Sequence, residues 1–162
     1  MRGRVGEGEA GAGSAGRPAR DTIVLTDDAG TRHRVRLAAV DAPEMRVVPW
    51  GAWARAALDA LIGGGRVVCT AADPARGRAD STDGGSAPPA RGRSRRIVAT
   101  CRSVGIADPR RADLGAALIA GGYAVEHRAY GGGVYRAEED AASLAGRGLW
   151  AGWLAEGAIP RR

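Results

Sequence analysis

Two carboxylates stand three residues apart at the end of a basic, alternating stretch of this sequence. Asp41 and Glu44 flank Pro43, and residues 34–37 before them alternate between arginine and apolar side chains, the period of a strand with two unlike faces. Proline fixes its own φ and keeps the preceding residue extended, so the two acids lie on a rigid hinge. With Arg36 nearby, this set could hold a metal ion, orient a water molecule and neutralise a phosphate, as metal-assisted phosphodiester hydrolysis requires.

The same stretch places three cations on one face of the expected strand. Arg32, Arg34 and Arg36 alternate with other residues, so they repel one another unless an anion or solvent neutralises them. The whole chain carries a net charge of +6, and all its 24 basic residues other than histidine are arginine. A polyanion partner would explain this, because arginine binds phosphate through two parallel hydrogen bonds. A general bias toward arginine, alanine and glycine would explain it equally well.

Other elements must position this hinge. Residues 21–25 and a strand beginning at Thr31 flank the turn signal Asp27-Asp28-Ala29-Gly30, which predicts a hairpin. Residues 49–63 carry apolar side chains at helical spacing, with Trp50 and Trp53 expected in the core. Residues 66–70 and 95–101 predict two more strands.

Two further helices are expected in the C-terminal half. The first begins at Asp113, a good N-cap, and ends at the glycine pair 121–122. The second covers residues 135–148. Strands before and between helices predict a small α+β domain.

The length of 162 residues predicts one domain. Residues 1–20 predict a disordered, mildly basic leader without the apolar centre of a signal peptide, and residues 155–162 a loose tail. Residues 74–94 have almost no apolar side chain, which predicts an inserted loop. The sequence contains no run of about 18 apolar residues, so no membrane span is expected.

Because residues 1–20 lack the features of a signal peptide, we expect the protein to be located in the cytoplasm, or to be exported if the true start lies upstream. We also expect a monomer.

Residues 36–44 resemble the signature of the thermonuclease family, the staphylococcal nuclease-like domains, whose strand has the form Arg-Leu-x-x-Val/Ile-Asp-x-Pro-Glu. Matches in order and spacing extend over about residues 21–150, interrupted by the inserted loop. The resemblance implies a five-stranded Greek-key barrel of the OB type with three α-helices over residues 21–154. It also implies that Cys69 and Cys101, the two cysteines, lie on neighbouring strands; a buried thiol pair and a disulfide both remain open.

The resemblance also implies a role for each site residue. Asp21 and Asp41 hold Ca²⁺ with help from the Ala42 carbonyl, Glu44 orients or deprotonates the attacking water, and Arg36 and a second arginine neutralise the phosphate. Counting back from the strand at 97–101 places Arg96 in the second arginine position, with Arg76, Arg78, Arg93 and Arg95 as alternatives. His127 occupies the place of one of the family's tyrosines near the nucleotide, and Tyr130 could serve for the other.

The chain departs from the family pattern at two motifs. The family reads Asp-Gly-Asp-Thr where this chain has Ala19-Arg20-Asp21-Thr22, and its Asp-x-Tyr-Gly-Arg motif is not recognisable here. Despite these departures, the resemblance implies a Ca²⁺-dependent nuclease that hydrolyses DNA or RNA, prefers single strands and leaves 3′-phosphates. The alternative is an OB-type nucleic-acid-binding module that has lost catalysis.

Overall fold

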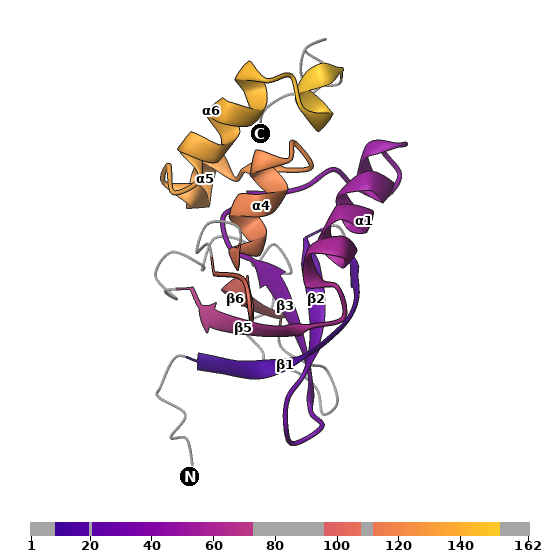
Figure 1. Cartoon of the computed structure of the whole chain (residues 1–162), viewed down its shortest axis with the longest axis vertical. Helices are drawn as coiled ribbons and strands as arrows, with labels where there is room; N and C mark the ends of the chain where they lie inside the picture. Colours follow the sequence, from indigo (N-terminus) through magenta and orange to yellow (C-terminus); the bar gives the residue numbers. More distant parts are fainter. Residues whose placement is uncertain (1–8, 20, 73–95, 108–111, 153–162) are drawn as a thin grey trace, which may run out of the picture.

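The computed structural model of the chain describes residues 9–19, 21–72, 96–107 and 112–152 (Figure 1). Its strands are β1 (Glu9–Ala19), β2 (Thr22–Thr26), β3 (Arg32–Leu37), β4 (Val40–Asp41), β5 (Arg66–Ala71), β6 (Arg96–Ser103) and β7 (Val125–Glu126). Its helices are α1 (Trp50–Ile62), α4 (Leu114–Ala120), α5 (Arg128–Gly131), α6 (Arg136–Leu144) and the 3₁₀-helix η2 (Gly148–Ala151).

Five strands form a closed barrel in the order β1-β2-β3-β6-β5. The sheet is mixed, because β3 and β6 run parallel while the other neighbours are antiparallel. Alternate side chains of β2 and β3 point into the barrel, where Ile23, Leu25, Val35 and Leu37 are buried. The other residues of β3, which alternate with these, therefore point away from the barrel core.

Three helices pack together beyond one end of the barrel. Figure 1 shows α1 and α4 next to each other above the strands, with α6 on the far side of α4. Asp113 caps α4, because its Oδ1 accepts hydrogen bonds from the Gly115 and Ala116 amides at 2.9 and 3.0 Å. The Tyr135 hydroxyl also donates to this oxygen at 3.1 Å, and burial, then the charge of Asp113, raises the pKa of Tyr135. The predicted N-cap is thus confirmed.

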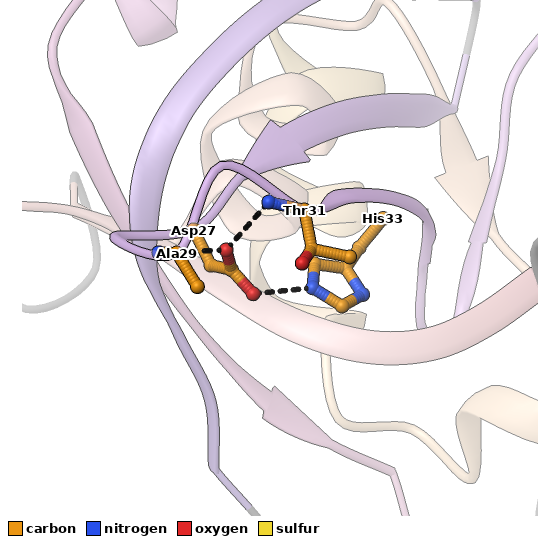
Figure 2. Close-up of polar contacts among 4 residues, drawn as sticks. All are labelled: Asp27, Ala29, Thr31 and His33. Carbon is orange, nitrogen blue, oxygen red and sulfur yellow. Dashed lines mark hydrogen bonds and ion pairs between the residues drawn. The ribbon is translucent and has the colours of Figure 1, made fainter.

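The β2–β3 turn is closed by one carboxylate (Figure 2). Asp27 Oδ1 accepts hydrogen bonds from the Ala29 and Thr31 amides at 3.0 and 2.8 Å, and Oδ2 lies 2.9 Å from His33 Nε2. The His33 hydrogen bond, followed by the Thr31 amide, lowers the pKa of Asp27. The predicted hairpin is confirmed, and every partner named here for Asp27 belongs to the hairpin itself.

Several expectations need correction. Residues 9–19 form β1, paired with β2 and β5, so the predicted disordered leader is wrong there. The described residues contain four α-helices, not three, because residues 128–131 form the short α5. Trp53 is 49% exposed and only contacts Trp50 edge-on at a centroid distance of 5.1 Å, so it is no core residue. The predicted loop at 74–94 and tail at 155–162 lie outside the described residues.

Cys69 and Cys101 form a disulfide. They face each other in the antiparallel pairing of β5 with β6, and both are buried in the barrel core. Of the two states that the sequence left open, the structure has the disulfide.

None of the helices described in the structure is both long enough and apolar enough to cross a bilayer.

Candidate functional site

Asp21 comes directly before Thr22, the first residue of β2, and lies beside the last residues of β3. Its backbone carbonyl accepts a hydrogen bond from the Leu37 amide at 2.8 Å, and the next residue, Thr22, pairs with Arg36. Asp21 is only 4% exposed. The register of the hairpin therefore places the Asp21 carboxylate next to the C-terminal end of β3, which leads into the hinge at residues 41–44.

Arg36 and Asp21 form a largely buried ion pair. Arg36 Nε lies 3.3 Å from Asp21 Oδ2, with the two side chains 15% and 5% exposed. The Thr22 hydroxyl donates to Asp21 Oδ1 at 3.0 Å. Because both side chains are largely removed from bulk water, the charge of each helps to offset the cost of burying the other.

The segment between β3 and the hinge is hydrogen-bonded to β6 and to His127, the residue that follows β7. The Ala38 amide donates to the Ala99 carbonyl on β6 at 2.9 Å, and the Ala39 carbonyl accepts from the His127 amide at 2.9 Å. Ala39 has a φ of 60°, in the left-handed region that costs a non-glycine residue about 1–2 kcal/mol. These two hydrogen bonds maintain a conformation that the isolated segment would avoid.

The first half of the hinge continues this anchoring. Asp41 pairs with Val125 in the small β4–β7 sheet, and its side chain is exposed. Ala42 is buried at 3% exposure. Asp21 and Asp41 therefore reach the same end of β3 from two directions, one through the hairpin and one through β4.

Glu44 lies on the exposed half of the hinge. Its Oε2 is 2.6 Å from Arg46 Nε, and the side chains of Glu44 and Arg46 are 48% and 82% exposed. This pair could not be predicted from the sequence, because two exposed side chains two residues apart have many alternative conformations.

Gly51 in α1 packs directly against the backbone of Glu44 and Met45. A Cβ at this position would collide with the Glu44 carbonyl oxygen. A glycine inside a helical pattern, which costs stability relative to alanine, was the signal that could have revealed this contact. The first turn of α1 thus fixes the distance between the helix and the hinge.

Arg96 begins β6, and its backbone pairs with Arg34, two residues before Arg36 on β3. Its side chain lies outside what the structure describes, as do Arg76, Arg78, Arg93 and Arg95. The role of Arg96 as a second phosphate ligand stays a prediction.

His127 and Tyr130 lie close to the hinge. Their rings stack with centroids 4.5 Å apart, and the His127 amide holds the Ala39 carbonyl. Within the described part of the chain, the buried His127 Nδ1 has no hydrogen-bond partner.

The oxygen donors suit calcium in kind, since Ca²⁺ prefers carboxylate and carbonyl ligands and tolerates loose geometry. Asp21, Asp41 and the Ala42 carbonyl provide such donors. No group of three His, Cys, Asp or Glu residues suited to a metal occurs within residues 9–19, 21–72, 96–107 and 112–152. A bound Ca²⁺ would thus rely on two carboxylates, the carbonyl and water.

A closed five-stranded barrel with acids and an arginine at the end of β3 defines a small α+β protein with a site suited to an anionic substrate. The family model described as staphylococcal nuclease homologue matches residues 34–152, and the chain belongs to this family. The resemblance found in the sequence is confirmed, and membership supports a nuclease or nucleic-acid-binding function. Asp21 lies before the matched range. A search of the curated proteins returned no match.

Proposed function

We propose that this protein is a Ca²⁺-dependent nuclease that hydrolyses DNA or RNA, prefers single strands and leaves 3′-phosphates. One observation carries the proposal: the buried Arg36–Asp21 pair lies at the strand end that leads into the Asp41–Glu44 hinge. A module that only bound phosphate would gain nothing from one carboxylate next to its arginine and two more on the segment that follows the strand, because carboxylates repel the ligand. We infer that the barrel is of the OB type, which commonly binds single strands.

Asp21, Asp41 and the Ala42 carbonyl would hold the calcium ion. When bound, Ca²⁺ supplies positive charge that stabilises the developing negative charge on a phosphodiester. Asp21 would then have two roles, since the same carboxylate orients the Arg36 guanidinium. Arg36 donates hydrogen bonds to the phosphate oxygens, and these bonds strengthen as charge builds in the transition state.

Glu44 would orient or deprotonate the attacking water. For this it must leave Arg46, and the exchange is inexpensive because exposed ion pairs contribute only about 0–1 kcal/mol. The substrate itself offers Arg46 another anion. Arg96 is the proposed second phosphate ligand.

A non-catalytic nucleic-acid-binding module is the second candidate. The replacement of the family's Asp-Gly by Ala19-Arg20, and a donor set with only two carboxylates for the metal, both favour it. The two candidates differ in whether Asp41 and Glu44 matter for anything beyond the fold.

A nuclease assay on single-stranded DNA and RNA, with Ca²⁺ or with a chelator, tests the proposal. We expect cleavage only with Ca²⁺, and a melting temperature that rises on Ca²⁺ addition. Asp41→Asn should remove both responses. Asp59→Asn is the matched control: its carboxylate, on α1, is also exposed and lies 4.0 Å from Arg55 Nε, its ion-pair partner among the described residues, so both responses should persist. Full activity in chelator would refute the metal assignment, and binding without any cleavage would favour the second candidate.

A further inference from the structure

The outer face of β3 carries an unbroken row of arginines. The strand alternates so that Val35 and Leu37 enter the barrel core while Arg32, Arg34 and Arg36 face outward. Arg36 is mostly buried in its pair with Asp21, whereas Arg32 and Arg34 are exposed. The row therefore begins at the candidate site and leads away from it along one straight strand.

The neighbours of this row on β2 do not neutralise it. The hairpin register places Thr22 opposite Arg36, Val24 opposite Arg34 and Thr26 opposite Arg32. On the other side, Val98 pairs with Arg36, and the backbone of a further arginine, Arg96, pairs with Arg34. Among the described residues, neither Arg32 nor Arg34 makes an ion pair or side-chain hydrogen bond.

The spacing of the row suits a linear polyanion. Side chains on one face of a strand repeat every two residues, about 6.6–6.8 Å. That is about twice the 3.4 Å rise per nucleotide of a stacked strand. A strand stacked with that rise presents every second phosphate at the spacing of the row, and a single strand extended to about twice that rise presents successive phosphates at the same spacing.

We propose that β3 is a phosphate track, in which Arg34 and Arg32 bind two successive phosphates beyond the one bound at Arg36 on a single strand of nucleic acid. This inference rests on the proposed function for the placement of the Arg36 phosphate. A single strand fits better than a membrane surface, because the row is one residue wide and its flanking residues on β2 are two threonines and a valine.

The track ends at the β2–β3 turn. Asp27 is occupied by His33 and the turn amides, and the exposed Asp28 adds a second carboxylate next to the end of the strand. Asp28 also lies 3.6 Å from Arg66 on β5. The row of arginines on β3 therefore ends here and offers two exposed arginines past the site.

The test compares two double variants with the same net charge. Arg32→Thr with Arg34→Thr removes the track and keeps residues that favour a strand. Arg102→Thr with Arg136→Gln removes two exposed arginines from β6 and α6 instead. Each lowers the formal charge from +6 to +4, since 22 basic residues then face 18 acidic ones. Circular dichroism and thermal melting establish that each variant folds.

Binding of fluorescent single-stranded oligothymidylate is measured in chelator by anisotropy over a range of salt concentrations. Each phosphate contact on a single strand contributes about 0.7 to the slope of log K against log salt. We expect the track variant to lose about 1.4 from the parent slope and the control variant to keep it. Equal slope losses in both variants, or no loss in the track variant, would overturn the proposal.

Two further outcomes separate this inference from the proposed function. If the parent cleaves nucleic acid but the track variant keeps the full salt slope, the phosphate-track inference is refuted and the proposed function is not. If the parent never cleaves, and the salt slope falls only when Arg32 and Arg34 are replaced, the proposed nuclease function is refuted and the phosphate-track inference is supported. The proposal would also be overturned if binding to anionic phospholipid vesicles required Arg32 and Arg34 while binding to oligothymidylate did not. That result would identify a lipid site.

Discussion

The β2–β3 hairpin has an aspartate paired with a basic residue of β3 at each of its two ends, and the two pairs differ in almost every physical respect. At the turn, Asp27 pairs with His33 across six residues, and the side chains are 29% and 34% exposed. At the open end, Asp21 pairs with Arg36 from the far ends of the two strands, and both side chains are mostly buried. The same device closes a turn at one end and builds a candidate site at the other.

The difference lies in what each carboxylate depends on. Asp27 is satisfied by two amides and one ring nitrogen that belong to its own hairpin (Figure 2). Asp21 needs the barrel, because its burial depends on the strands and loops packed around it. A local carboxylate network can form before the fold is complete, while a buried ion pair holds its geometry only in the finished structure.

The largest effect should come from Glu44→Gln at the open end. Removing the group that acts on water should lower turnover by about 10²–10⁴-fold. Oligonucleotide affinity should hold or improve, because a negative charge near a polyanion is lost. Single-turnover cleavage and equilibrium binding measure the two effects.

Asp27→Asn is the control from the turn end, and its turnover should match that of the parent. A Glu44→Gln variant that cleaves as fast as the parent would show that the two ends do not differ in catalytic role.

Arg36→Ala should have the next largest effect, on both stability and function. It removes the buried cation whose Nε lies 3.3 Å from Asp21 Oδ2, and removing one partner of a buried pair typically costs about 3 kcal/mol of unfolding free energy. Turnover and affinity should fall as well, because a phosphate ligand is lost. Urea unfolding gives the free energy.

The matched variant is Arg34→Ala, one exposed position along the same face of β3. Exposed substitutions of this kind usually change stability by less than about 0.5 kcal/mol. If both variants lose the same stability, the burial of the Arg36–Asp21 pair does not distinguish the two ends.

The smallest effect should be a pH dependence at the turn. The pKa of Asp27 is lowered in the folded state by His33 and the Thr31 amide, so its ionised form stabilises the fold above the ordinary carboxyl pKa of about 3.9. That contribution is lost as the pH falls through the lowered pKa. The melting temperature of Asp27→Asn should therefore lie below the parent at pH 5, and the gap should close as the pH falls below the lowered pKa of Asp27.

Asp28→Asn, one residue along the turn and 88% exposed, should follow the parent over the same range. A constant gap between Asp27→Asn and the parent at every pH would mean that the hydrogen bonds, and not the charge, hold the turn.

The contrast between the two ends also explains what could be predicted from the sequence. The hairpin, the hinge and the Asp113 cap depend on local signals, and the structure has all three. The roles of Arg36, Asp41, Glu44 and Asp21 were expected from a short motif and its spacing, and they stay proposals.

The missed features depend on distant partners or on individual conformations. β1 is rich in glycine and alanine, which carry little strand propensity, and it exists through backbone pairing with β2 and β5. Ala39 adopts a positive φ although it is not a glycine. Its conformation is held because the Ala38 amide is hydrogen-bonded to β6 and the Ala39 carbonyl to the His127 amide. The contact of Glu44 with Arg46 depends on a choice among exposed side-chain conformations.

The disulfide between β5 and β6 gives the chain a covalent topology of its own. Cys69 and Cys101, 32 positions apart, turn everything between them into a ring from which the two arms of the chain leave at adjacent points. A single cut in that ring, by trypsin at Arg76 for example, would linearise it without separating the molecule. The nicked protein would run as one species on a gel without thiol and as two with it. The arm that carries Asp21, Arg36, Asp41 and Glu44 would remain bonded to the arm that carries α4 and α6.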